Sequence, residues 1–290
     1  MQQSPLPASF DPVVSINSGQ VFLWEKYNNS WYGIHGDRVI KFTRASDGRS
    51  EFSSFPELTS WEYKMFRLDD EIDRILEEIS FDPFVCRLVK VYPGLRLIRQ
   101  EPHQCLFSFI CASNTNIPMI RRMLWLLTRK FGNQVLVDGK DFFTFPSAAS
   151  INKATIDELR SCSVGYRAKA IKAAAEHIVT GELDFDILKK TNYGRAKQEL
   201  LQLYGIGNKI ADCILLFSLE KLDAFPIDVW IARSLANHYT WLHKRQFGDK
   251  ITSSQYQLLS SRARKYFGKY AGYAQQYIYY HMRHTAGKKW

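Results

Sequence analysis

The sequence predicts an α+β protein, in which a small N-terminal antiparallel sheet module precedes a large all-helical region. Three observations predict this class. From Gly19 to Thr43, aromatic or β-branched residues alternate with polar ones, as in strands with one buried face. From Pro102 onward, apolar residues recur at helical spacing almost throughout. The connections between the helical stretches are short and carry Gly, Pro, Asn or Ser. We therefore expect one domain at 1–101 and a second at 102–290.

The expected elements follow in order along the chain. Within the alternating stretch, Asn-Asn-Ser at 28–30 and His-Gly-Asp at 35–37 fit turns, which favours an antiparallel meander. Leu95–Arg99 is a candidate for one further strand. Three of the later helices matter most for function, and we expect them at Arg195–Leu203, Ile210–Leu219 and Val229–Tyr239.

Composition narrows the functional class. The chain has 290 residues, 46% of them hydrophobic, which is typical of a globular protein. Its net charge of +10 favours a polyanionic partner such as nucleic acid. No apolar run approaches the roughly 20 residues that cross a bilayer, and the N-terminus lacks a signal-peptide pattern. The scattered cysteines form no CxxC pair, which indicates reduced thiols in an intracellular protein and neither a zinc site nor an iron–sulfur cluster.

A glycine-containing turn joins two of the expected helices. Gly205 and Gly207 allow a sharp turn that presents backbone N–H groups at a helix N-terminus, where a phosphate oxygen can bind. This pattern, at about 195–219, is typical of a helix–hairpin–helix that grips one DNA strand. Such glycines also occur in ordinary helix-to-helix turns, so the spacing by itself leaves both interpretations open.

A lysine directly after this turn favours the DNA interpretation. Lys209 lies in the first turn of a helix, where the positive end of the dipole disfavours the ammonium form. A neutral amine is a nucleophile that forms a Schiff base with a carbonyl carbon. Asp228 lies at the expected start of another helix and suits an N-cap. A carboxylate kept ionised by backbone N–H groups there could also stabilise a cationic sugar or accept a proton from Lys209.

These residues carry a resemblance to a known family. LYGIGNKIADC at 203–213, followed by AFPIDVW at 224–230, resembles the helix–hairpin–helix and Gly/Pro-Asp signature of the HhH-GPD DNA glycosylase superfamily. Within it, the chain is most similar to the 8-oxoguanine DNA glycosylase/AP lyases. Four more blocks occur in the same order: SGQVFLW, GLRLIRQEPHQCLFSFICASNTNI, VGYRAKAI and YAGYAQQYIYY. The resemblance implies a helical region of two subdomains. The iron–sulfur branch needs four closely spaced C-terminal cysteines, and no cysteine follows Cys213.

The resemblance implies how the catalytic and base-binding residues would act. Lys209 would attack C1′ of the damaged nucleoside and form an imine, assisted by Asp228, and β-elimination would nick the strand. Four residues would bind the flipped base. Cys213 and Tyr279 would contact its two faces, Gln275 its Watson–Crick edge, and the Gly19 carbonyl the N7 hydrogen that 8-oxoguanine has and guanine lacks. Taken singly, each of these four also suits a core, surface or turn position; their joint occurrence in order favours the functional role.

Further residues would hold the DNA after the base is extruded. Asn114 matches a gap-filling asparagine, Tyr166 an aromatic wedge, and Arg167 a contact to the opposite cytosine. Asn114 would also suit a turn, and Tyr166 an ordinary loop.

Two positions depart from the family pattern. Met119 stands where an arginine reads the opposite cytosine, so selectivity for cytosine is in doubt unless Arg121 or Arg122 substitutes. Trp230 replaces a phosphate-binding histidine and could only pack on the sugar–phosphate backbone.

The leading hypothesis is therefore an enzyme of DNA repair: a bifunctional 8-oxoguanine DNA glycosylase and AP lyase that acts on double-stranded DNA as a monomer. We expect no required cofactor and no catalytic metal, with a structural monovalent cation at the hairpin as the one plausible ion. Two alternatives stay open. A monofunctional alkylated-base glycosylase typically lacks the lysine, and a non-catalytic helix–hairpin–helix DNA-binding protein needs neither Lys209 nor Asp228.

Overall fold

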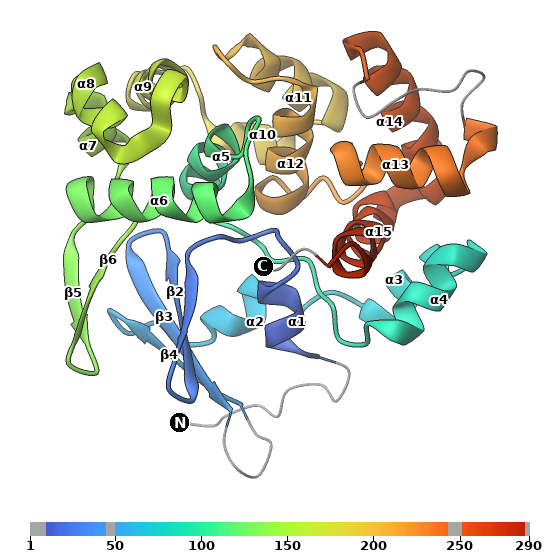
Figure 1. The fold of residues 1–290 in the computed structure, drawn as a ribbon, viewed down its shortest axis with the longest axis horizontal. Coiled ribbons are helices and arrows are strands. Elements are labelled where there is room, and N and C mark those ends of the chain that lie inside the picture. Colours follow the sequence, from blue (N-terminus) through green and yellow to red (C-terminus); the bar gives the residue numbers. More distant parts are fainter. Residues whose placement is uncertain (1–9, 45–49, 243–250, 288–290) are drawn as a thin grey trace.

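A computed structural model describes residues 10–44, 50–242 and 251–287. Figure 1 shows a twisted sheet at the lower left, with helices above it and to its right. This is the predicted α+β order, a sheet module followed by helices. Within the described ranges, no helix has the length and apolar character of a membrane span.

The sheet is a four-stranded antiparallel meander, as predicted for its first three strands. Its strands run in chain order: β1 (Trp24–Tyr27), β2 (Ser30–His35), β3 (Arg38–Arg44) and β4 (Ser50–Phe55). The sequence analysis did not expect β4. Gly33 on β2 lies opposite Trp24, and a Cβ at Gly33 would come within 2.4 Å of the indole ring. A glycine is therefore needed at this position. It allows the Trp24 indole to pack with Phe42 and Phe66 in a second hydrophobic core, separate from the main one.

Four short helices accompany the sheet: α1 (Pro12–Ile16), α2 (Trp61–Met65), α3 (Ile72–Ile79) and α4 (Pro83–Val91). The strand considered for Leu95–Arg99 is absent, and the segment belongs to neither a helix nor a strand. Its backbone instead bridges other elements, because Arg99 N–H donates to Met65 O at 2.7 Å and Gln100 N–H donates to Phe217 O at 2.8 Å. The prediction of a strand at Leu95–Arg99 was therefore wrong, because these backbone N–H groups donate to carbonyls of α2 and α12 and not to another strand.

The second region begins at α5 and is mostly helical. Its elements are α5 (Pro102–Cys111), α6 (Ile117–Phe131), β5 (Gln134–Val137), β6 (Lys140–Phe143), α7 (Ala148–Lys153), α8 (Ile156–Leu159), α9 (Ala168–Val179), α10 (Phe185–Lys190), α11 (Tyr193–Gln202), α12 (Asn208–Ser218), α13 (Val229–His238), α14 (Ser253–Phe267) and α15 (Ala271–Thr285). The β5–β6 hairpin corrects the expectation of an all-helical region. Asp138 and Gly139 at its tip both have positive φ, the signature of a type I′ turn, so the Asp-Gly pair was a readable signal.

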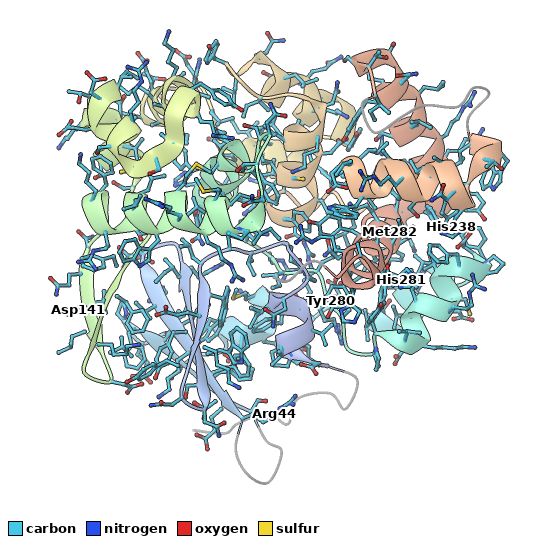
Figure 2. All side chains as sticks on the ribbon, in the orientation of Figure 1. Arg44, Asp141, His238, Tyr280, His281 and Met282 are labelled. Atoms are coloured by element: carbon cyan, nitrogen blue, oxygen red, sulfur yellow. The ribbon has the colours of Figure 1, made fainter. Side chains whose placement is uncertain are left out.

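The helices form two groups that meet at the functional site. In Figure 1, α6 to α9 lie on one side and α11 to α15 on the other, while α5 packs against α12 between them. The last helix, α15, packs against α3, α4, α13 and α14, so it joins the two halves of the chain. Phe84 of α4 stacks on His238 of α13, with ring centroids 4.3 Å apart, and meets His281 of α15 edge-on. Figure 2 labels these two histidines beside α4.

Candidate active site

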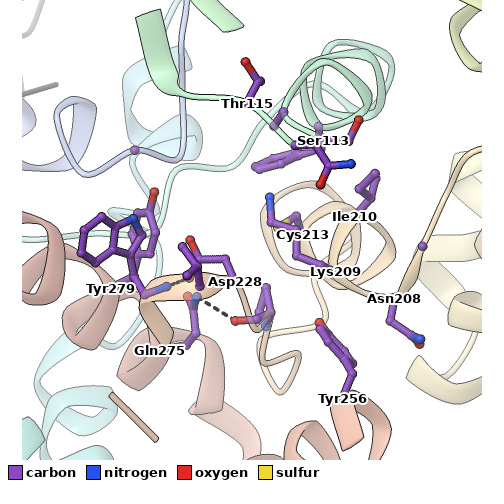
Figure 3. Close-up of a pocket in the computed structure, with 18 of the residues that line it drawn as sticks. Ser113, Thr115, Asn208, Lys209, Ile210, Cys213, Asp228, Tyr256, Gln275 and Tyr279 are labelled. Atoms are coloured by element: carbon purple, nitrogen blue, oxygen red, sulfur yellow. Dashed lines mark hydrogen bonds between the residues drawn. The ribbon is translucent and has the colours of Figure 1, made fainter. Parts of the chain in front are cut away.

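A pocket of about 610 Å³ opens where the C-terminal end of α5, the N-termini of α12 and α13, and the side of α15 meet. Most of the residues singled out in the sequence line it: Gly19, Asn114, Gly207, Lys209, Cys213, Asp228, Trp230, Gln275 and Tyr279. Figure 3 shows Lys209 and Cys213 on one side of this space, and Asp228, Gln275 and Tyr279 on the other. Residues up to 260 positions apart in the sequence thus face one cavity.

The helix–hairpin–helix is formed by α11 and α12, and its two glycines have different roles. Gly205 has φ +81°, and a Cβ there would lie 2.7 Å from the Ala170 Cβ on α9, so both conformation and space require glycine. Gly207 is the N-cap of α12 with an extended φ of −97°, and a Cβ there would meet nothing within 4 Å. No side chain caps α12. Its first backbone N–H groups therefore remain available to an external oxygen, such as one of a phosphate.

Lys209 extends from the first turn of α12 and is partly buried. Its Nζ lies 5.1 Å from the centroid of the Phe109 ring. Cys213 lies one turn later, is buried, and interacts with the lysine amine. Burial raises the pKa of the Cys213 thiol to about 12, although the nearby Lys209 opposes the shift. The thiol therefore stays protonated at neutral pH, which makes it a poor nucleophile.

Asp228 is the N-cap of α13, as expected. Its Oδ1 accepts hydrogen bonds from Trp230 N–H at 3.0 Å and Ile231 N–H at 2.9 Å. The sequence analysis expected these bonds to keep the carboxylate ionised. Instead, dense packing around the carboxyl raises the pKa of Asp228, outweighing the backbone N–H groups and the positive charge of Lys209. A carboxylate with a raised pKa is a stronger proton acceptor, which suits a general base.

Gln275 and Tyr279 lie one turn apart on α15. The Gln275 side chain is 5% exposed, and its Nε2 donates to Pro226 O at 3.0 Å. Among the described residues, its Oε1 has no hydrogen-bond partner. An unpartnered buried amide oxygen costs free energy in the empty pocket, so it favours a ligand that donates a hydrogen bond. Tyr279 is partly buried beside it, and burial raises the pKa of its hydroxyl, so the ring stays neutral for stacking.

Gly19 lies on the loop between α1 and β1 and lines the same pocket. Its φ of +79° places it in the left-handed region that favours glycine. Gly19 therefore lies next to α15, although the two are far apart in sequence. Its expected role, in which its carbonyl contacts the same base as Gln275, requires this position.

Asn114, Tyr166 and Arg167 lie together beside the pocket, and Asn114 is at its rim. Tyr166 is 64% exposed, and its hydroxyl accepts a long hydrogen bond of 3.5 Å from Asn114 Nδ2. Arg167 is only 9% exposed; its guanidinium lies 4.6 Å from the Tyr166 ring, and its Nε donates to Ser113 O at 3.1 Å. Tyr166 is therefore free to act as a wedge in this conformation. Arg167 would first have to release Ser113 to reach an opposite base.

The two departures from the family pattern also have clear positions. Met119 is exposed on the first turn of α6. Arg121 and Arg122 line a different cavity, of about 350 Å³, between α6 and the sheet. They are therefore not placed to substitute for the missing arginine. Trp230 lines the main pocket, and the guanidinium of Arg233 lies 5.1 Å from its ring, which brings a cation near this position.

Sequence reasoning missed a buried network behind the catalytic residues. Asp212 is fully buried on α12 and accepts hydrogen bonds from Tyr256 OH at 2.7 Å, Tyr193 OH at 2.6 Å and Lys197 Nζ at 2.9 Å. Tyr256 OH also accepts from Ile227 N–H at 3.1 Å, directly before the N-cap of α13. The network therefore ties the helix of the lysine to the segment of the carboxylate. An aspartate between two apolar residues of a helix was the available signal.

Comparisons with known proteins match two parts of this chain to described families. Residues 107–255 match the family described as HhH-GPD superfamily base excision DNA repair protein, and residues 5–106 match the N-terminal domain of 8-oxoguanine DNA glycosylase.

Similar proteins and structures carry related names. The probable N-glycosylase/DNA lyase of Methanothermobacter thermautotrophicus is 33% identical over 66% of this chain, and the N-glycosylase/DNA lyase of Saccharomyces cerevisiae is 31% identical over 74%. The chain spans 64% of the length of each of these two relatives. The crystal structure of Clostridium acetobutylicum 8-oxoguanine glycosylase/lyase with dsDNA containing cytosine opposite 8-oxoG has a TM-score of 0.86. It is 28% identical, with 96% of this chain and 93% of that chain covered.

Proposed function

The chain belongs to the HhH-GPD superfamily of base excision DNA repair proteins, as its sequence predicted, and we propose that it excises 8-oxoguanine from duplex DNA and then cleaves the abasic strand. One observation carries the proposal most directly. Lys209 and Asp228 begin two different helices that converge on one pocket, and the unpartnered amide oxygen of Gln275 lies in the same pocket. A nucleophile, a proton acceptor and a base-reading group are thus within one cavity large enough for a purine.

The first step is base excision. The amine of Lys209 attacks C1′, and the bond from C1′ to the base breaks with its electron pair going to the base, which takes up a proton. The attached amine gives its proton to Asp228, whose raised pKa favours that transfer. The C1′–O4′ bond then breaks with its electron pair going to O4′, which takes up the proton held by Asp228, while the nitrogen lone pair forms the protonated imine. The two backbone N–H groups that hold Asp228 keep the carboxyl oriented while it changes charge.

The second step is strand cleavage. The imine acidifies the C2′ hydrogens, so a base removes one, and the electron pair forms a C2′–C3′ double bond. The C3′–O bond breaks, and the 3′ phosphate leaves with the electron pair of that bond. Water then hydrolyses the imine and releases Lys209. No step in this sequence uses a metal or cofactor.

Base recognition rests on the walls of the pocket. Cys213 and Tyr279 provide two apolar contact surfaces from different helices, and Gln275 offers both a donor and an unpartnered acceptor. The Gly19 carbonyl would accept the N7 hydrogen of 8-oxoguanine. This role is supported by the position of Gly19 in the lining and by its left-handed backbone.

The DNA partner is proposed to lie across the hairpin and the Asn114 rim. The uncapped N-terminus of α12 suits a phosphate, Asn114 would fill the gap left by the flipped base, and exposed Tyr166 would act as the wedge. Every proposed contact comes from one chain, so we propose that the protein acts on DNA as a monomer. We also propose that it acts inside the cell, where the DNA is. Met119 cannot donate to a base edge, and we therefore propose relaxed selectivity for the base opposite the lesion.

Borohydride trapping tests this function. The wild-type chain is incubated with duplexes that carry one 8-oxoguanine opposite each of the four bases, with Lys209→Gln as the matched control. The expected result is a covalent protein–DNA adduct that is absent in the control and that forms opposite more than one base.

Other outcomes favour the two alternatives. If the wild type forms no adduct but releases an alkylated base, the chain is a monofunctional glycosylase. If it binds the duplex and releases no base, the non-catalytic role holds and the proposal is wrong.

A further inference from the structure

The loop that carries Gly19 is held by buried glutamine side chains on both sides of the glycine. The carbonyl of Ser18 accepts a hydrogen bond from Gln276 Nε2 at 2.8 Å. The carbonyl of Gln20 accepts one from Gln100 Nε2 at 2.7 Å. Gln276 is only 2% exposed, and Gln100 is also buried. The two peptide units that flank the Gly19–Gln20 peptide are therefore held by donors that solvent does not reach.

The side chain of Gln20 adds a third attachment. Its Oε1 accepts from Ile98 N–H at 2.7 Å, and its Nε2 donates to Arg96 O at 2.8 Å and to Ser18 Oγ at 2.7 Å. The loop is thus bonded to the segment at 95–100. That segment is itself bonded to α12 through the 2.8 Å hydrogen bond from Gln100 N–H to Phe217 O. A continuous set of hydrogen bonds connects the Gly19 loop to the helix that carries the lysine.

This arrangement leaves the Gly19 carbonyl for a ligand. Its two neighbours are occupied, whereas the Gly19 carbonyl accepts no hydrogen bond from any described residue. Holding both flanking peptide units holds the Cα atoms of Gly19 and Gln20, which leaves only a flip of the peptide between them. That flip would force Gln20, which does not have a positive φ, into the left-handed region that disfavours residues other than glycine, so the direction of the Gly19 carbonyl is held. Glycine by itself would not fix it, because it is the most permissive residue.

We infer that Gln276 is a positioning residue for lesion discrimination: through Ser18 it holds the Gly19 carbonyl in register with Gln275, its neighbour on α15. This inference rests on the proposed function. One helix would then control both readers of the base, the amide of Gln275 and, indirectly, the carbonyl of Gly19. Gln276 itself lines the pocket, but its donor is used on the loop.

Binding to two closely matched lesions tests the inference. One duplex carries 8-oxoguanine, and the other carries 8-oxo-7-deazaguanine, which has a C–H in place of the N7–H. Each protein carries Lys209→Gln so that no reaction occurs, and the ratio of the two Kd values is measured. Gln276→Met keeps the length of the side chain but removes the donor. We expect it to lower the preference for 8-oxoguanine by about fivefold to tenfold, the loss for a weakened hydrogen bond.

Gln104→Met is the matched control. Gln104 is another buried glutamine that holds a loop, because it accepts from Gly36 N–H at 2.7 Å and donates to Ile34 O at 2.8 Å, but it does not line the pocket. Its replacement should leave the Kd ratio unchanged. Gln276→Asn, whose shorter amide falls away from Ser18, gives a second variant if the methionine variant does not fold.

The possible results separate the inference from its premise. If the parent protein prefers 8-oxoguanine and both Gln276 variants keep the full preference, the inference is overturned and the role of Gly19 stands. If Gln104→Met lowers the ratio as much, the effect is general loosening of the fold and the inference also fails. If the parent shows no preference, the role of Gly19 and the inference fall together, while excision is decided independently by the trapping experiment.

Discussion

Tyr256→Phe probes whether the buried network sets the position of Asp228. The tyrosine hydroxyl donates to Asp212 Oδ2 at 2.7 Å and accepts from Ile227 N–H at 3.1 Å. Burial raises the pKa of Tyr256, so the hydroxyl keeps its proton and serves as the donor. The phenylalanine variant removes one oxygen atom and keeps the ring, so it isolates these two hydrogen bonds.

The expected size of the effect follows from the two bonds. A hydrogen bond to a charged group contributes about 1.5–3 kcal/mol, and a buried N–H left without a partner costs about 1–3 kcal/mol. Because Asp212 keeps Tyr193 and Lys197 as partners, we expect a net loss near the lower end, about 3 kcal/mol in the free energy of unfolding. Loss of the bond at Ile227 also loosens the residue before Asp228. A displacement of the carboxyl by about 1 Å would slow excision by up to about a hundredfold.

Denaturant unfolding and single-turnover excision of 8-oxoguanine measure the two effects. Tyr239→Phe is the matched control, because Tyr239 is also buried and donates to an aspartate, Asp82 Oδ1, at 2.9 Å. Neither Tyr239 nor Asp82 lines the pocket. Both variants should lose stability, but only Tyr256→Phe should lose excision rate. If a folded Tyr256→Phe protein excises at the wild-type rate, or if both variants slow equally, the network does not position the carboxyl.

Four further substitutions test the hairpin, the position facing the opposite base and the carboxyl. Gly205→Ala should lower the free energy of unfolding by about 1–3 kcal/mol because φ is +81° and the Ala170 Cβ blocks the added atom. Gly207→Ala should have a free energy of unfolding within about 0.5 kcal/mol of the wild-type value, yet it should bind duplex DNA more weakly. Equal DNA binding would contradict the phosphate role of the N-cap. Met119→Arg should raise the preference for cytosine over adenine opposite the lesion, by about 1–3 kcal/mol for a bidentate contact, in an excision assay with paired duplexes; an unchanged ratio would show that position 119 does not reach the base. Asp228→Asn should slow excision by about 10²–10⁴-fold and still cap α13. Because the pKa of Asp228 is raised by folding, the folded state binds more protons at this carboxyl than the unfolded state does. The free energy of unfolding therefore falls as pH rises from the unfolded-state pKa of this carboxyl through its folded-state pKa. The Asn variant should therefore gain stability relative to wild type between acidic and neutral pH, and a constant difference across that range would refute the shift.

Local pattern determined the parts of the site that lie on single elements. Lys209 and Cys213 are one turn apart on α12, Gln275 and Tyr279 one turn apart on α15, and helical periodicity places each pair on one face. Asp228 was recognisable as an N-cap because a short carboxylate before an apolar helical run satisfies the first N–H groups. The sheet meander was recognisable from alternation and turn residues. These features depend on contacts within a few residues, which a sequence displays directly.

Tertiary structure decided what depends on partners far along the chain. Arg167 was expected at the opposite base, but its side chain is buried against Ser113. Arg121 lines a second cavity instead of the main pocket. Both outcomes depend on the packing of α6 and α9, which decides which helix faces are covered. The raised pKa of Asp228 reflects burial, which capping alone does not reveal. The contacts of Tyr256 with Asp212 and of Gln276 with Ser18 join residues 44 and 258 positions apart. No local pattern encodes such pairs, since a buried polar side chain is satisfied by whichever group the completed fold brings within hydrogen-bond distance.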